Sequence, residues 1–206
     1  MDIRIAAMSG VILMLCAMNV QGANTAAGID EAAVKVAVEL CSACHGPAGS
    51  STSATFPILA GQQEQYLAAQ LKAFKSKERA DPEAHDYMWG MGASLPDSLI
   101  DGLAHYFASQ SPPRGTPGDP ALVTEGKKLY EDGDKAKKVS ACSGCHGVHG
   151  EGNSVFPRLE GQHAAYTVRQ LEVIQKNLRA SPVMHGIITQ LTPNQMKAIA
   201  EFLQSK

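Results

Sequence analysis

The chain has 206 residues, of which 44% are hydrophobic and 18% charged, and its formal net charge at pH 7 is −2. This length is enough for one large domain or two small ones, each with its own core. The composition excludes an intrinsically disordered chain and a protein made mainly of membrane spans, and the charge balance speaks against nucleic acid as a partner.

The first predicted element is an export signal. Arg4 precedes an apolar run over residues 5–20, which small and polar residues follow. The run has about 16 residues, fewer than the roughly 20 that a membrane-spanning helix needs. We therefore predict a signal peptide over residues 1–22, cleaved between residues 22 and 27, and a periplasmic location. Retention of this segment as a membrane anchor is the alternative.

Four cysteines remain after the predicted signal, and they lie in the stretches CSACHG and CSGCHG. Each stretch is a C-x-x-C-H motif, in which thiols three residues apart share a helix face and can reach the two vinyl groups of haem. A thioredoxin-like redox pair or a zinc site would need surroundings that this sequence lacks. We predict two covalent haem c groups, attached at Cys41, Cys44, Cys142 and Cys145, with His45 and His146 as iron ligands.

The two motifs belong to an internal repeat. His45 recurs as His146 with a shift of 101, and FPILAGQ recurs as FPRLEGQ with a shift of 100. The stretch between the halves is rich in proline and glycine, which neither a helix nor a central strand sustains. The sequence therefore predicts two tandem domains at residues 23–108 and 121–206, joined by a linker at 109–120.

Each half has the pattern of a helical domain. Asp30 is placed to cap a helix that runs into the first motif, and residues 62–77 have apolar side chains at helical spacing. Thr192 and Gln195 form a capping box before the last helix. No alternating strand pattern appears. We predict an all-α fold of two domains, each packed around one haem.

A haem iron that only transfers electrons needs a sixth ligand opposite its histidine. Met88 lies seven residues before Leu95, and Met184 lies seven residues before the repeat equivalent, Leu191. We predict Met88 and Met184 as these ligands. Met91, whose equivalent is an isoleucine, is the alternative to Met88. His85 and His185 do not correspond in the repeat, which disfavours ligation by two histidines.

The two halves differ in charge. Residues 23–113 hold five Lys or Arg against ten Asp or Glu, whereas residues 114–206 hold twelve against nine. Such a dipole can orient a protein on a charged partner and speed their encounter.

Together, the two CxxCHG motifs, the two FPxLxGQ stretches and the methionine before each last helix resemble the dihaem cytochrome c4 family. The resemblance covers nearly all of the mature chain. It implies two cytochrome c folds with haems near the domain interface, and a backbone carbonyl of Pro57 and of Pro157 that holds each histidine ring.

The resemblance also implies an electron carrier and not an enzyme. The donor would be a cytochrome bc complex or a dehydrogenase, and the acceptor a haem-copper terminal oxidase; peripheral contact with the membrane stays open. Two alternatives are a dihaem oxidoreductase, such as a thiosulfate dehydrogenase or a peroxidase, and a fixed electron-accepting subunit of a dehydrogenase. An open iron position would distinguish the enzyme, and the presence of both methionines speaks against it.

Overall fold

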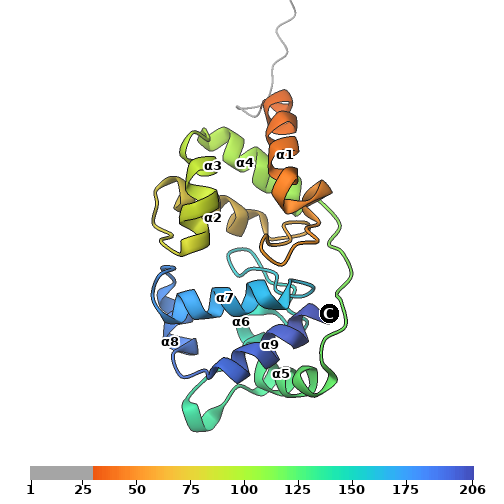
Figure 1. Cartoon of the computed structure of the whole chain (residues 1–206), viewed down its shortest axis with the longest axis vertical. Helices are drawn as coiled ribbons and strands as arrows, with labels where there is room; N and C mark the ends of the chain where they lie inside the picture. Colours follow the sequence, from red (N-terminus) through yellow and green to blue (C-terminus); the bar gives the residue numbers. More distant parts are fainter. Residues whose placement is uncertain (1–29) are drawn as a thin grey trace, which may run out of the picture.

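The structure is a computed structural model that describes residues 30–206, so the predicted signal peptide lies outside the described residues. Two helical halves are stacked, and an extended segment runs down one side from the first half to the second (Figure 1). The described residues contain isolated β-bridges but no β-strand. The predicted all-α fold is confirmed.

The N-terminal half is built from four α-helices and two short turns: α1 (Glu31–His45), η2 (Pro47–Gly49), α2 (Glu64–Lys75), η3 (Ala84–Met88), α3 (Trp89–Ala93) and α4 (Asp97–Ala108). Asp30 caps α1, because its carboxylate accepts the backbone N–H groups of Ala32 and Ala33. The cap predicted from the sequence is therefore confirmed. The turn η3 is a π-helix, and α2 is shorter at both ends than the predicted segment 62–77.

The C-terminal half consists of α5 (Pro120–Asp132), η4 (Lys135–Lys137), α6 (Ser143–His146), α7 (Ala164–Gln175), α8 (Pro182–Ile188) and α9 (Pro193–Gln204). The predicted capping box is present, since Thr192 and Gln195 each bond the backbone of the other at the start of α9. Whereas α1 runs without a break into its motif, α5 ends ten residues before Cys142 and a loop intervenes.

The core of the C-terminal half lies where α5 crosses α9. Tyr130 is fully buried there beside Phe202, with ring centroids 5.4 Å apart. The helices approach closely at Gly126, where a Cβ atom would lie only 1.9 Å from the carbonyl oxygen of Ala198. Glycine is therefore the residue that this crossing admits.

The two halves meet along a surface that we call the seam, formed by Gln62, Gln63 and Arg79 on one side and by Arg158, Gln162 and Arg179 on the other. An antiparallel β-bridge joins Arg79 to Arg179, and the adjacent Ala80 N–H donates to the carbonyl of Leu178 at 3.1 Å. Within residues 30–206, no helix is both long and apolar enough to cross a membrane.

Candidate haem sites

The N-terminal site begins at the end of α1. Cys41 and Cys44 are three residues apart on this helix and so share a face. His45 is buried, and its Nδ1 atom lies 2.9 Å from the carbonyl oxygen of Pro57, as the resemblance implies. Burial lowers the pKa of His45, an effect that the Pro57 carbonyl partly opposes, so the ring is neutral at pH 7. Neutral imidazole is the form that binds a metal.

The helix stops directly after the histidine because Gly46 adopts a φ of 76°. A Cβ atom there would lie 2.5 Å from the carbonyl oxygen of Ser50. Both the backbone angle and the space therefore require glycine, and the turn that follows leads the chain back toward Pro57.

The stretch MWGM contributes its two methionines to the cavity wall. Met88 is the last residue of η3 and Met91 lies within α3, and both line the same cavity as His45. The indole N–H of Trp89 donates to the carbonyl of Arg79 at 2.7 Å, which fixes the segment between the two methionines. Both methionines thus come near the site, and the choice of Met88 as ligand stays a prediction.

The C-terminal site has the same plan on different elements. Cys142 and Cys145 lie at α6, and His146 is buried with its Nδ1 atom 3.0 Å from the carbonyl oxygen of Pro157. Burial lowers the pKa of His146 and raises that of the free Cys142 thiol to about 11. Met184, on α8, lines the cavity wall in this half.

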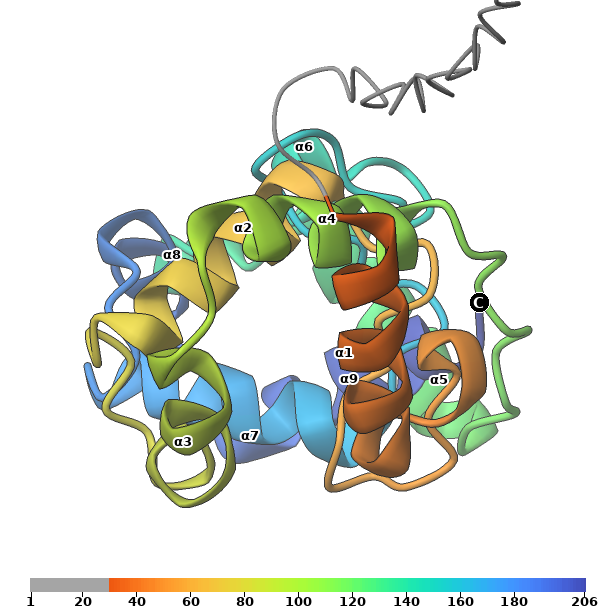
Figure 2. The same ribbon diagram turned by 90° about the horizontal axis from the view of Figure 1, so that it is seen from above.

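The residues present fit two haem groups. A cavity of about 650 Å³ extends across both halves, and apolar side chains form most of its wall. Its walls include residues of α1, α2 and α4 from one half and of α7, α8 and α9 from the other, and Figure 2 shows these helices from above. Both cysteine pairs, both histidines and both predicted methionines line it. An apolar space next to each motif suits a flat apolar macrocycle.

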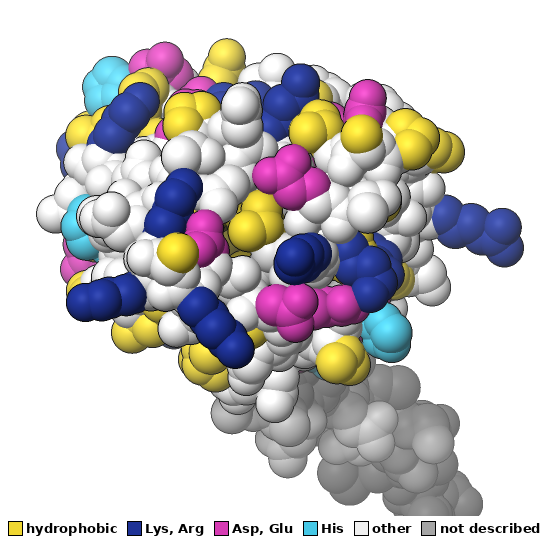
Figure 3. Space-filling model, turned by 90° about the horizontal axis from the view of Figure 1, so that it is seen from below, with side chains coloured by type: hydrophobic (Ala, Val, Ile, Leu, Met, Phe, Trp, Pro, Cys, Tyr) yellow, Lys and Arg dark blue, Asp and Glu magenta, His cyan; other side chains and the backbone are white. Residues whose placement is uncertain are grey.

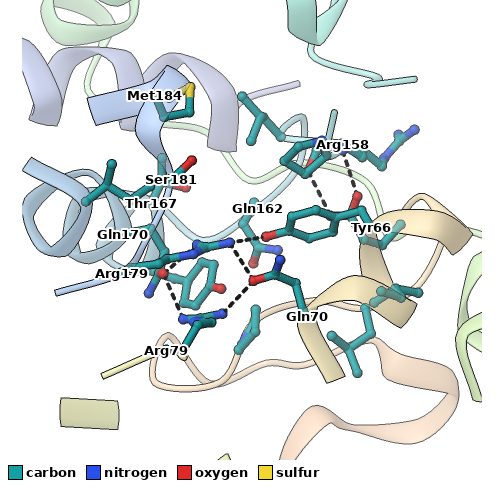
Figure 4. A pocket seen from close by; sticks show the side chains of 18 of the residues that line it. Tyr66, Gln70, Arg79, Arg158, Gln162, Thr167, Gln170, Arg179, Ser181 and Met184 are labelled. Carbon is teal, nitrogen blue, oxygen red and sulfur yellow. Dashed lines mark hydrogen bonds between the residues drawn. The ribbon is translucent and has the colours of Figure 1, made fainter. Parts of the chain in front are cut away.

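A buried polar cluster closes the cavity at the seam (Figure 4). Arg79 donates to the side-chain oxygens of Gln70 and Gln170, both at 3.1 Å. Arg179 donates to the same two oxygens at 2.9 and 2.7 Å. It also donates to the hydroxyl of Tyr66 at 2.6 Å. The two arginines are thus related by the internal repeat, and they share their acceptors.

The cluster departs from this symmetry at one position. Arg79 donates to both carboxylate oxygens of the fully buried Asp81, at 3.0 and 3.1 Å. The repeat equivalent of Asp81 is Ser181, so among the described residues no carboxylate forms an ion pair with Arg179 as Asp81 does with Arg79. Burial alone would lower the pKa of Arg179, but Tyr66, Tyr166 and Asp81 together raise it by more, so the guanidinium stays charged.

Sequence reasoning missed Arg79 and Arg179, although they also obey the repeat shift of 100. Arg158 also lies at the domain interface. Its backbone lies in the seam, and its side chain pairs with Glu160. His163 bonds the carbonyl of Ser51 across the seam at 3.0 Å.

The helical fold, the two motifs and the shared apolar cavity define the class of protein: a c-type cytochrome with two haem domains. A family model described as Cytochrome c matches residues 31–111 and 123–206. The chain belongs more narrowly to the cytochrome c4 family, and it is a dihaem electron-transfer protein with two covalently bound haem c groups.

Three comparisons give the extent of the likeness. The chain is 37% identical over 205 residues to cytochrome c4 of Azotobacter vinelandii, covering 94% of this chain and 97% of that protein. The crystal structure of reduced recombinant cytochrome c4 from Pseudomonas stutzeri superposes with a TM-score of 0.76 at 36% identity, covering 86% and 99% of the two chains. A thiosulfate dehydrogenase electron acceptor from Thiomonas intermedia is 34% identical over 174 residues, 81% of this chain and 78% of that protein.

Proposed function

We propose that this protein is an exported electron carrier in which His45 and Met88 hold one iron, and His146 and Met184 the other. The observation that carries the proposal is the same in both halves. A carbonyl fixes the Nδ1 side of each buried histidine, so Nε2 is the nitrogen left for iron, and a methionine lines the same cavity. When bound, each haem supplies a one-electron ferric–ferrous couple.

The chain's own groups would keep both irons closed to other ligands. His45 with Met88, and His146 with Met184, would hold the two irons, and this pair of ligand types would favour a relatively high potential and leave no position for a substrate. The apolar wall excludes water from the ring faces, and the neutral histidines need not lose a proton to bind. We therefore propose single-electron transfer in and out of residues 23–108 and 121–206 as two domains joined by 109–120.

The partners we propose are other redox proteins, with a cytochrome bc complex or a dehydrogenase as donor and a haem-copper oxidase as acceptor. The site of action would be the periplasm. The charge difference between the halves supports docking by opposite charge. The end of the molecule formed by the C-terminal half carries Lys and Arg side chains at several places, among scattered acidic ones (Figure 3), so its donor or acceptor would present acidic groups.

A second candidate is favoured by one comparison. A relative at 34% identity bears the name thiosulfate dehydrogenase electron acceptor, and a carrier that receives electrons from such a dehydrogenase would need the same closed irons. Mixing the oxidised protein with a purified thiosulfate dehydrogenase and thiosulfate tests this. Fast reduction of both haems supports the second candidate, and reduction only by a quinol-oxidising complex supports the first.

The near-infrared spectrum of the oxidised holoprotein tests the ligation itself. Two histidine–methionine sites give the methionine-to-ferric-iron band at full intensity for two haems. Half of that intensity, or a high-spin signal, would contradict the proposal and identify the haem with an open position as the place for substrate chemistry.

A further inference from the structure

The FPxLxGQ stretches of the two halves form hydrogen bonds to one another across the seam. The side-chain amide of Gln162 bonds both backbone groups of Ile58: the Ile58 N–H donates to Oε1 at 3.0 Å, and Nε2 donates to the Ile58 carbonyl at 3.0 Å. The amide of Gln62 does the same to Arg158, at 2.7 and 2.9 Å. Both glutamines are buried, so these four bonds form away from water.

Each backbone N–H bonded by a glutamine, that of Ile58 or of Arg158, belongs to a peptide group that holds the histidine ring of its own half. The Ile58 N–H and the Pro57 carbonyl are the two ends of one planar peptide group. The carbonyl end lies 2.9 Å from Nδ1 of His45, while the N–H end donates to Gln162 of the other half. Gln162 therefore fixes the plane that aims the Pro57 carbonyl at His45.

The other half has the same arrangement with the roles exchanged. The peptide group between Pro157 and Arg158 lies between Nδ1 of His146, at 3.0 Å, and Oε1 of Gln62, at 2.7 Å. A bond donated by an N–H polarises its peptide group and strengthens the carbonyl at the other end as an acceptor. The link is thus electronic as well as geometric.

We infer that Gln62 and Gln162 are positioning residues for the iron-bound histidine of the opposite half. Each orients and polarises the peptide group that holds that histidine. The inference rests on the proposed ligation by His45 and His146. A carbonyl that accepts from Nδ1 raises the basicity of the imidazole, which favours ferric iron and lowers the reduction potential. Loss of one glutamine amide should therefore raise the potential of one haem, the one in the other half.

The test uses Gln162→Met and Gln62→Met in the haem-loaded full protein, because methionine keeps the length of glutamine and removes its hydrogen bonds. Proton NMR resolves the ring signals of each iron-bound histidine and, followed through a redox titration, gives the midpoint potential of each haem. Each haem is assigned to its half by its contacts with residues of known sequence assignment. Q162M should shift the His45 signals and raise the N-terminal potential while the C-terminal haem keeps its wild-type values. Q62M should give the converse.

Gln63→Met is the matched control. Gln63 also crosses the seam, donating to the carbonyl of Glu151 at 3.0 Å and accepting the N–H of Ser154 at 3.2 Å. It touches neither of the two peptide groups that hold a histidine ring; the peptide group whose carbonyl it bonds reaches only the backbone carbonyl of His146, at 2.8 Å. Q63M should leave both potentials at their wild-type values. A shift of equal size in Q63M and Q62M would mean that the glutamines only join the halves, and it would overturn the inference.

Three other results would overturn the inference: a shift confined to the haem in the half that carries the substitution, an equal shift of both haems, or no shift of either potential.

Should Q162M fail to load haem, a second variant, Gln162→Glu, keeps the oxygen that accepts from the Ile58 N–H and loses the bond donated to the Ile58 carbonyl. The Ile58 amide should then stay protected from hydrogen exchange, and the His45 signals should shift while those of His146 keep their wild-type positions; an unprotected amide or unshifted His45 signals would overturn the inference. If the wild-type protein showed no ring signals from iron-bound His45 and His146, that result would instead contradict the proposed ligation.

Discussion

The two halves hold their haem sites in the same way but build their cores differently. The cluster of fully packed side chains in the C-terminal half is the larger one among the described residues, and Tyr130 at its centre bonds the carbonyl of Gly147 directly after the haem motif, at 2.6 Å. In the N-terminal half, α1 buries only Val38 and His45, and Val36 on the same helix is 68% exposed.

The comparison teaches which parts of the repeat are needed for the site. The motif, the proline carbonyl and the glutamine that bonds across the seam are kept in both halves, while the crossing of the first and last helices is tight in one half and loose in the other. The buried carboxylate of the seam, Asp81, also lies in the N-terminal half. We infer that the N-terminal half depends more on its haem and on the seam, and the C-terminal half more on its own core.

The largest expected effect concerns the methionines, which lie on a π-helical turn in one half and on α8 in the other. Met88→Ala and Met184→Ala should each remove one of the two contributions to the near-infrared band, because each opens one iron. Met91→Ala should leave the band at full intensity. If M91A, and not M88A, loses half the band, the repeat does not extend to this ligand.

Asp81→Ser gives the N-terminal half the residue found in the C-terminal half and leaves Arg79 buried without its carboxylate. Removing one partner of a buried ion pair costs about 3–5 kcal/mol. Guanidinium unfolding followed by circular dichroism measures the loss. Ser181→Ala, at the matching position, should change stability by less than about 1 kcal/mol, so equal losses in the two variants would show that the seam does not distinguish the halves.

Gly126→Ala tests the tight crossing of α5 and α9. The added methyl group would overlap the carbonyl of Ala198, and such overpacking destabilises a core by about 1–3 kcal/mol. Gly90→Ala in α3 is the control, because nothing lies within 4 Å of its Cβ position and the change favours a helix. Unfolding curves should show G126A destabilised and G90A unchanged or slightly stabilised; two equal curves would contradict the close packing.

The smallest effect is a pH dependence at the seam. Burial lowers the pKa of His163, the nearby Arg169 lowers it further, and the Ser51 carbonyl opposes both. The unfolded chain therefore binds the proton more readily, so this part of the stability is full above the ordinary histidine pKa of about 6.5 and is lost as the pH falls below it. We expect less than about 1 kcal/mol, because solvent screens the partly exposed ring.

The measurement is the difference in unfolding free energy between wild type and His163→Gln as the pH falls from neutral. Subtracting the variant removes the contribution of the other histidines. A difference that stays constant with pH would show that His163 does not titrate with folding.

Local patterns accounted for much of the fold. The cap at Asp30 and the capping box at Thr192 depend on residues two or three positions away, and the two haem motifs are contiguous, so sequence alone predicted them. The seam depends on pairs about a hundred residues apart, and each partner taken alone is an ordinary polar side chain. Nothing in a single sequence indicates that Arg79 and Arg179 share acceptors.

The MWGM stretch shows the same limit on a smaller scale. The repeat aligned Met88 with Met184, but the two residues lie in different kinds of helix, a π-helical turn and the α-helix α8. The π-helical turn precedes Trp89, whose indole bonds the carbonyl of Arg79. That bond depends on how the preceding loop folds back, which helical spacing does not encode.

The seam has a further consequence, because its contacts are reciprocal: Gln62 binds Arg158 while Gln162 binds Ile58, and Arg79 faces Arg179. A surface in which position i meets j and j meets i is the mark of a two-fold symmetric homodimer. A single half that carried this surface would be self-complementary. The chain can thus be regarded as a covalent dimer. Because the linker fixes the local concentration of one half near the other, the association of the halves does not depend on the protein concentration.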